Sequence, residues 1–149
     1  MSGSAGIVHD VIDVSAVMRS VASAAQGAVV LFVGTVRDLN DGRPVTGMDY
    51  TAYESMALKE MNEIANEAAE KHPGALIRMV HRLGSLDVGE PSVVIATSHP
   101  HRDSAYAANR YAIEHLKKRV PIWKREHYAD GTREWVDPSG KKGEPQEAR

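Results

Sequence analysis

The chain has 149 residues, of which 42% are hydrophobic and 26% charged, a composition typical of one globular domain rather than of disordered or fibrous proteins. Its formal net charge of −2 excludes a surface that is basic throughout and clamps nucleic acid or membrane. The absence of cysteine excludes disulfides, thiolate nucleophiles and Cys-ligated metal centres. No apolar run approaches the roughly 18 residues of a membrane span and no signal peptide is recognisable, so we expect a cytoplasmic protein.

The first third of the chain is predicted to form an edge strand, a short helix and a hairpin. The edge strand is expected over 7–14, and a helix capped by Ser15 over 15–25, with Gly27 ending it. The β-branched run 28–36 predicts a strand buried on both faces. The turn signal Asn40-Asp41-Gly42 predicts that this strand pairs with a returning strand over 45–53.

The rest of the chain alternates two long helices with short strands. Helices are predicted over 54–71, with Met56 and Met61 in the buried stripe, and over 103–119, where Pro121 stops the helix. Strands are predicted over 75–83, 92–97, 122–127 and 133–136, with a turn between Gly84 and Pro91. This order indicates a single α+β domain over 1–137 with a mainly antiparallel sheet and packed helices. The polar residues 138–149 are expected to form a flexible tail.

Basic side chains occur at strand and helix ends in four places. Arg37 follows the buried strand, where a charged residue at a strand end commonly pairs with a carboxylate such as Asp38. His101 and Arg102 precede the second long helix, whose N-terminus attracts anions, although two solvated side chains in a capped loop explain them equally well.

The other two places lie around Pro121. Lys117 is in the last helical turn, where cations are favoured by the helix dipole alone, but it flanks the buried stripe. Lys124 follows in the next strand, which could turn back and bring it near Lys117. Alternation puts Lys124 and Glu126 on one face of that strand and Arg125 on the other.

Together these cations would form a basic pocket on a net-acidic protein, which suits a small anionic ligand such as a phosphate ester. Two neighbouring lysines lower each other's pKa, so that one of them can act as a general base or a nucleophile. The sequence contains no glycine-rich phosphate loop, and its seven histidines have no metal-binding spacing.

Several motifs resemble the large (catalytic) subunit of molybdopterin synthase. In chain order they are VGTVRD, NDGRPV, VHRLGSLDVGE, HPHRDSAY and LKKRVPIWKRE. The resemblance runs from about Val29 to Val136, and the two lysines that flank the Pro-hydrophobic-Trp segment are its most specific part.

The resemblance implies an α/β-hammerhead type of fold and a sulfurtransferase of molybdenum cofactor synthesis. Such an enzyme converts cyclic pyranopterin monophosphate (precursor Z) into molybdopterin. The sulfur comes from the C-terminal Gly-Gly thiocarboxylate of a small ubiquitin-like subunit, so a chain without cysteine can transfer sulfur. The resemblance also implies a homodimer within a heterotetramer, and neither a metal nor another cofactor.

The resemblance assigns roles residue by residue. Lys117 and Lys124 correspond to the two catalytic lysines. The substrate-binding positions are Thr35, Val36, Arg37, His101, Arg102, Lys117, Lys124, Arg125 and Glu126. Chemically, the Arg and His side chains would hold the phosphate and pterin through charge-assisted hydrogen bonds. Lys117 would polarise the thiocarboxylate carbonyl and Lys124 would serve as the acid or base.

Two other functions are compatible with these residues. One is an anion-binding or regulatory domain without activity, against which the presence of both lysines argues. The other is a module that docks a ubiquitin-like protein without any pterin chemistry.

Overall fold

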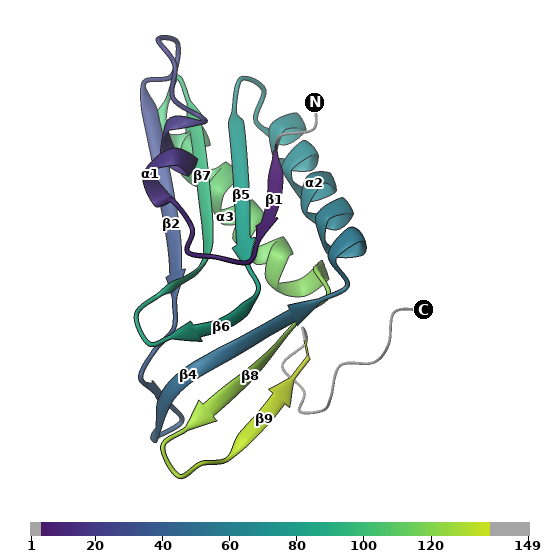
Figure 1. Ribbon diagram of the computed structural model, residues 1–149. Helices are drawn as coiled ribbons and strands as arrows, with labels where there is room; N and C mark the ends of the chain where they lie inside the picture. The colour runs from purple at the N-terminus through teal and green to yellow at the C-terminus, as the bar shows by residue number, and fades with distance from the viewer. Residues whose placement is uncertain (1–3, 138–149) are drawn as a thin grey trace.

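Two β-sheets and three helices make up residues 4–137, the part of the chain that the computed structural model describes (Figure 1). The first sheet has the order β1 (Ala5–Val8), β5 (Leu76–Arg82), β7 (Pro91–His99) and β2 (Ala28–Thr35). Only β1 and β5 pair in parallel in this sheet; its other pairs are antiparallel. The predicted α+β class with a mainly antiparallel sheet is confirmed.

The second sheet lies at one end of the first and carries the C-terminal hairpin. Its strands are β3 (Leu39–Asn40), β4 (Arg43–Ala52), β8 (Ile122–Tyr128) and β9 (Arg133–Val136), and β6 (Gly84–Asp87) also pairs with β4. All of these pairs are antiparallel. The last two strands and the turn between them agree with the prediction.

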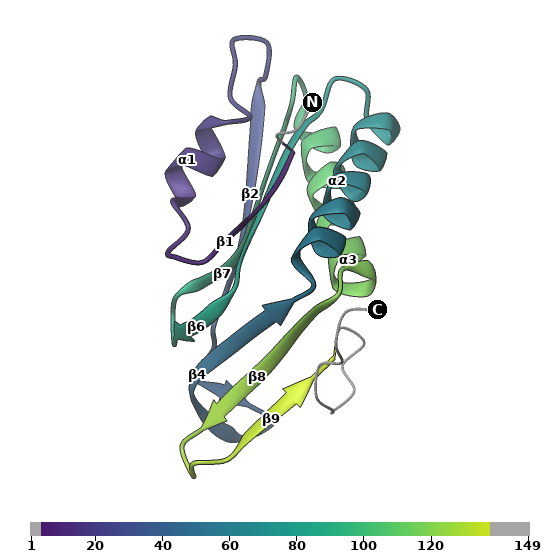
Figure 2. The ribbon, with the colours of Figure 1, turned by 45° about the vertical axis from the view of Figure 1, so that its right-hand side comes forward.

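The helices cover the first sheet unequally. Helices α2 (Glu54–Lys71) and α3 (Arg102–Arg119) pack on one face, and the short α1 (Val14–Arg19) packs on the other (Figure 2). The main core lies between the sheet and the two long helices, where Met61, Ile64, Met79 and Ile95 are fully buried. This packing fixes α3, whose two ends carry three of the nine predicted site residues: His101, Arg102 and Lys117.

Buried polar contacts add to the anchoring of α3. The Asn109 side chain donates to the carbonyls of Val30 and Ile95 at 3.2 and 3.1 Å, and the Thr97 hydroxyl donates to the carbonyl of Ala105 at 2.7 Å. Each bond satisfies a polar group that would otherwise be costly to bury. The helix is thereby held in one register against β2 and β7.

The predicted N-terminal elements are too long. The edge strand is Ala5–Val8, and α1 ends at Arg19 with Asp13, not Ser15, as its side-chain N-cap (3.0 Å to the Ala16 N–H). Gly27 does not end this helix. A Cβ there would lie 2.7 Å from the carbonyl oxygen of Pro100, so Gly27 permits a close approach of two backbone segments.

The predicted hairpin between 28–36 and 45–53 is wrong. The turn at Asp41 and Gly42, with φ of 50° and 77°, joins β4 to the two-residue β3, whereas β2 pairs with β7. Strand β2 is also an edge strand rather than one buried on both faces, because Val29 and Leu31 are 40% and 37% exposed.

The two long helices lie almost where the sequence predicts them. The bounds of α2 agree, but Met56 is 51% exposed and Ala57 takes its place in the core. The segment between Gly84 and Pro91, predicted as a turn, contains strand β6. The extent of the domain, 1–137, stays a prediction, and the predicted tail 138–149 lies outside the described residues.

Candidate functional site

Lys117 lies in the last turn of α3, where that helix meets the second sheet. The helix ends because Val120 is extended and Pro121 cannot continue the hydrogen-bond ladder. Partial burial lowers the pKa of the Lys117 ammonium, and the charges of Lys124 and Arg37 lower it further. The structure therefore brings three predicted site residues together, and we call Lys117, Lys124 and Arg37 the cationic cluster.

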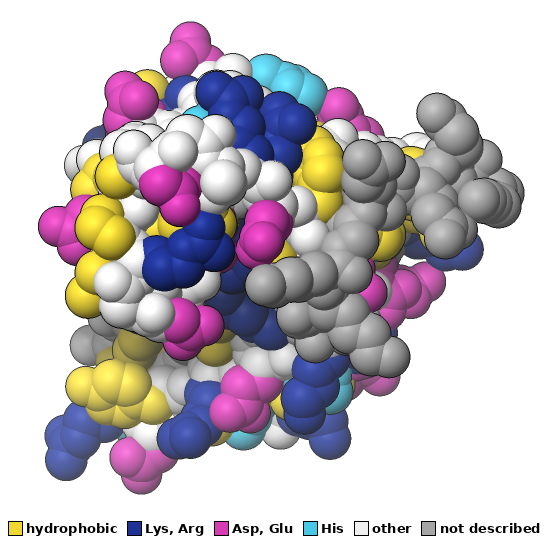
Figure 3. Space-filling view, turned by 90° about the horizontal axis from the view of Figure 1, so that it is seen from below, with side chains coloured by type: hydrophobic (Ala, Val, Ile, Leu, Met, Phe, Trp, Pro, Cys, Tyr) yellow, Lys and Arg dark blue, Asp and Glu magenta, His cyan; other side chains and the backbone are white. Residues whose placement is uncertain are grey.

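Lys124 reaches the cluster because the chain reverses at Pro121 and continues as β8. It lies opposite Tyr50 of β4, and directly opposite residues in an antiparallel pair share one face of the sheet. Glu126 lies on the same face, as the alternation predicts. Figure 3 shows that Lys and Arg side chains lie among acidic side chains at this end of the molecule.

Arg37 joins the cluster from the loop that follows β2. Its guanidinium lies 3.4 Å from the side-chain oxygen of Asn40, a weak contact, and within residues 4–137 no ion pair joins it to Asp38. Thr35 is exposed at a β-bulge. Val36 is 2% exposed, and its N–H and carbonyl bond to Glu90 and Gly89. The Val36 side chain therefore packs in the core, and its assignment to substrate binding stays a prediction.

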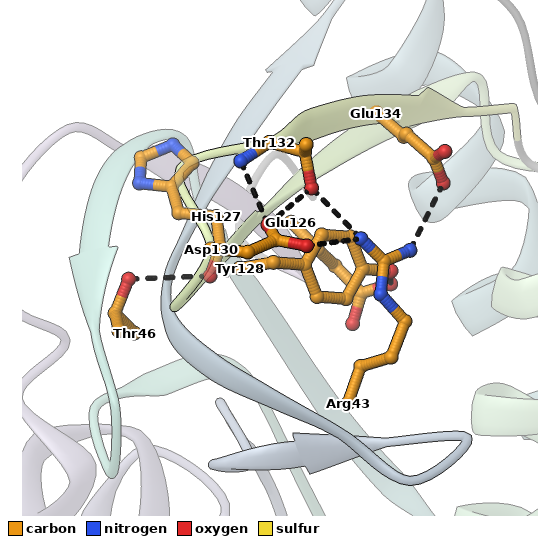
Figure 4. A network of polar contacts seen from close by, with 8 residues as sticks. All are labelled: Arg43, Thr46, Glu126, His127, Tyr128, Asp130, Thr132 and Glu134. Carbon is orange, nitrogen blue, oxygen red and sulfur yellow. Dashed lines mark hydrogen bonds and ion pairs between the residues drawn. The ribbon is translucent and has the colours of Figure 1, made fainter.

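Beside the cluster, Glu126 forms the floor of a pocket of about 400 Å³, whose rim includes Lys124. The Glu126 carboxylate is 5% exposed and accepts hydrogen bonds from Asn40 at 2.8 Å and from the Tyr128 hydroxyl at 3.0 Å. Arg43 lies over the Tyr128 ring, 3.5 Å from its centroid. Arg43 also donates to Thr132 at 2.7 Å and is close to Asp130 and Glu134 (Figure 4).

Arg125 points away from the cluster, as the alternation predicts, so it does not join Lys124 in one pocket. On the opposite face of the sheet it forms an ion pair with Asp49 at 2.7 Å and stacks on Trp135. Burial alone would raise the pKa of Asp49, but hydrogen bonds from Ser85, His127 and Arg125 outweigh it and lower the pKa to about 2. The Arg125 guanidinium is thus held in an ion pair, and its assignment to substrate binding stays a prediction.

His101 and Arg102 lie at the far end of α3 from Lys117. His101 is the N-cap residue, and its backbone N–H donates to Nδ1 of His99 at 3.0 Å. The helix has 18 residues, so a rise of about 1.5 Å per residue separates its ends by roughly 25 Å. The single pocket predicted for all six cations therefore does not form within one chain.

His81 interacts electrostatically with Lys117, and Tyr50 lies opposite Lys124, although neither was predicted to belong to the site. His81 is 4% exposed, and its ring meets the Tyr50 ring edge-on with centroids 5.1 Å apart. The strand alternation over 75–83 already places His81 with Ile77 and Met79 on the buried face. Its electrostatic interaction with Lys117 arises from the tertiary packing of α3 on β2 and β7, which local sequence does not encode.

Neither a metal site nor a membrane span is present in residues 4–137. No group of three or more His, Asp or Glu side chains in this part of the chain could hold a metal ion. None of its helices is both long and apolar enough to span a membrane.

Comparison with known proteins identifies the family. The profile of the MoaE protein family matches residues 7–119. The chain belongs to the MoaE family. It is 45% identical to the molybdopterin synthase catalytic subunit of Pyricularia oryzae, over 87% of this chain and 71% of that protein. It is also 45% identical to that of Bacillus subtilis, over 80% and 76%.

Solved structures agree with this assignment. The X-ray crystal structure of molybdopterin synthase from Staphylococcus aureus superimposes with a TM-score of 0.84 at 40% identity. The superposition covers 91% of this chain and 96% of that one. This solved relative therefore shares the fold described above.

Proposed function

We propose that this chain is the catalytic subunit of a molybdopterin synthase, a sulfurtransferase that converts cyclic pyranopterin monophosphate into molybdopterin. The observation that carries the proposal is the convergence of Lys117, Lys124 and Arg37 in a member of the MoaE family. Relatives that are 45% identical over most of the chain are molybdopterin synthase catalytic subunits.

The cationic cluster supplies the chemistry that this reaction needs. The Arg37 guanidinium is exposed and, within residues 4–137, has one weak hydrogen-bond partner, so it can bind phosphate oxygens in a bidentate way. Lys117 has a lowered pKa and can exchange a proton more readily than an ordinary lysine. We assign Lys117 to the thiocarboxylate carbonyl and Lys124 to proton transfer on the pterin side chain.

The chain contains no cysteine that could carry the sulfur, so we propose that a partner supplies it. A small ubiquitin-like subunit with a C-terminal Gly-Gly thiocarboxylate fits this requirement. A diglycine tail lacks side chains, so it can enter a narrow channel and deliver the thiocarboxylate to Lys117. Exclusion of water from that channel would protect the thiocarboxylate from hydrolysis.

The far position of His101 and Arg102 is explained by a second copy of the chain. Within residues 4–137, β2 pairs only with β7, so its other edge is open to a strand of another molecule. In β2, Ala28 pairs with His99 near the His101 end, and Thr35 precedes Arg37 at the cluster end. Two β2 strands paired antiparallel about a two-fold axis would bring His101 and Arg102 of one copy to Arg37 of the other.

Mixing two inactive variants tests both the activity and the shared site. Wild-type protein should form molybdopterin when it is supplied with the thiocarboxylated small subunit and cyclic pyranopterin monophosphate. Lys117→Ala and Arg102→Ala should each lose most of this activity. If copies exchange, mixed dimers contain one intact site, so an equal mixture should recover about a quarter of the wild-type activity.

Two results would contradict these proposals. An equal mixture that stays inactive, although exchange of subunits is shown by mass, would show that Lys117 of one copy and Arg102 of the other do not share a site. Stable docking of the small subunit without any product from wild-type protein would favour a docking module over an enzyme.

A further inference from the structure

His101 and Arg102, which the proposed function places at the substrate, have no side-chain support in this chain. Both are exposed, and within residues 4–137 no hydrogen bond or ion pair holds either side chain. His101 is the N-cap residue of α3, but its ring makes no capping hydrogen bond. The positions of both side chains therefore depend on how the backbone that enters α3 is held.

His99 holds this backbone through its ring. It is the last residue of β7, and its Nδ1 atom accepts a hydrogen bond from the backbone N–H of His101 at 3.0 Å. Its Nε2 atom lies 3.0 Å from the carbonyl oxygen of Pro73, in the loop that follows α2. One ring thus joins the ends of α2 and β7 to the start of α3, at the end of the molecule away from the second sheet (Figure 1).

The two partners fix the tautomer of the His99 ring. A carbonyl oxygen can only accept, so Nε2 carries the proton and donates to Pro73. A backbone N–H can only donate, so Nδ1 is unprotonated and accepts from His101. Both ring nitrogens are used, and the orientation of the ring is thereby determined.

The backbone of Pro100, between the two histidines, is held as well. A Cβ at Gly27 would lie 2.7 Å from the carbonyl oxygen of Pro100, so this carbonyl packs directly against the backbone of Gly27. The proline ring fixes φ of Pro100, and the backbone of His99 pairs with Ala28 of β2. The bond from His101 to the His99 ring therefore sets the direction in which the chain enters α3.

We propose that His99 is a positioning residue, whose ring, held by Pro73, fixes the His101 backbone so that the side chains of His101 and Arg102 point to the substrate. The proposal rests on the proposed function in that these two side chains bind cyclic pyranopterin monophosphate. Because neither has a side-chain partner, loss of the His99 bond lets both move. It weakens substrate binding without removing any group that touches the substrate.

Two substitutions of His99 separate the two hydrogen bonds of its ring. His99→Asn places an amide oxygen near the position of Nδ1 and keeps the acceptor for His101. His99→Gln places an amide nitrogen near the position of Nε2, so it keeps the donor for Pro73 but loses that acceptor. The two variants thus differ in whether the N–H of His101 has a partner.

Nuclear magnetic resonance tests the hydrogen bonds without any need for activity. At about pH 8, where an ordinary histidine is neutral, the ¹⁵N-labelled ring of His99 should show the Nε2–H tautomer. The amide hydrogen of His101 should exchange with solvent at least about tenfold faster in His99→Gln than in His99→Asn. The Nδ1–H tautomer, or equal exchange rates in the two variants, would overturn the proposal.

Titration calorimetry tests the consequence for the substrate. If His99 positions the two side chains, His99→Gln should bind cyclic pyranopterin monophosphate about tenfold more weakly than His99→Asn. Equal affinities in the two folded variants, or the reverse order, would overturn the proposal.

Gln26→Ala is the matched control for a merely structural role. The Gln26 amide donates to the Gly74 carbonyl and to the Ser98 hydroxyl, both at 3.0 Å. Its loss loosens the same end of the fold but leaves the N–H of His101 bonded. We expect Gln26→Ala to lower the thermal stability and to keep the wild-type affinity. A loss of affinity as large as that in His99→Gln would show that only general stability matters, and would overturn the proposal.

These measurements also separate this inference from the proposed function. If wild-type protein neither binds cyclic pyranopterin monophosphate nor forms molybdopterin, the proposed function fails. The resonance experiment then still decides, on its own, whether His99 fixes the backbone of His101.

Discussion

Acidification from pH 6.5 to 4 should destabilise the protein through His81. Burial and the charge of Lys117 lower the pKa of His81 from 6.5 to about 4 in the folded protein. Between these values the unfolded chain binds the proton and the folded protein does not, so the free energy of unfolding falls as the pH falls. Above pH 6.5 this penalty is absent.

The fall in pKa corresponds to a loss of about 3 kcal/mol by pH 4. This is a large share of the stability of a domain, which is typically about 5–15 kcal/mol. The carboxyl of Asp49, with a pKa of about 2, stays ionised over most of this range and does not account for the loss.

Urea unfolding at about pH 7, 5.5 and 4.5 measures the effect. Wild-type protein should lose stability steadily over this series, whereas His81→Gln, which has no titratable group at this position, should lose about 2.5 kcal/mol less between pH 7 and 4.5. If wild type and His81→Gln show parallel pH dependences, His81 is not held neutral by burial and the reasoning is refuted.

Three further predictions concern the site and its support. Lys124→Ala should lower molybdopterin formation by about 100-fold or more without unfolding the protein, whereas the solvent-facing control Lys118→Ala should change this activity little. Near-normal turnover in Lys124→Ala would contradict the role assigned to Lys124. Asp49→Asn should lower the free energy of unfolding by about 1–3 kcal/mol, because it breaks a partly buried ion pair, whereas the exposed control Asp38→Asn should leave this free energy unchanged. Equal denaturation midpoints of Asp49→Asn and wild-type protein would contradict this prediction. Asn109→Ala should cost about 2 kcal/mol in thermal or urea unfolding, since two strand carbonyls lose their donor; a change below about 0.5 kcal/mol would show that water replaces it.

Local patterns predicted the elements well where a single periodicity governs a long segment. Helix α2 has the predicted bounds because its apolar stripe and the His72-Pro73-Gly74 stop are both local signals. The partner of β2 was missed because a turn between two strands suggests that they pair, whereas the strand pairing here depends on a distant segment. The turn at Gly42 was recognised correctly, but it serves only the two-residue β3.

The geometry of the candidate site was likewise predictable where it depends on local signals and not where it depends on tertiary packing. Lys117 and Lys124 come together because the break at Pro121 is encoded next to both of them. The separation of His101 from Lys117 follows from the length of α3, which the sequence also indicates. Grouping the basic residues into one pocket did not take this length into account. The electrostatic interaction between His81 and Lys117 depends on the tertiary packing of α3 on β2 and β7, so it could not be predicted from local spacing.

The central claim is that this chain moves sulfur from a thiocarboxylate to a pterin, and one single-turnover measurement tests it most directly. Wild-type protein is mixed with the thiocarboxylated small subunit and cyclic pyranopterin monophosphate, and mass spectrometry follows the subunit's tail and the pterin together. We expect the tail to change from thiocarboxylate to carboxylate in step with the appearance of molybdopterin, and both changes to fail in Lys117→Ala. A tail that keeps its sulfur, or that loses it to water without any sulfur reaching the pterin, would contradict the claim.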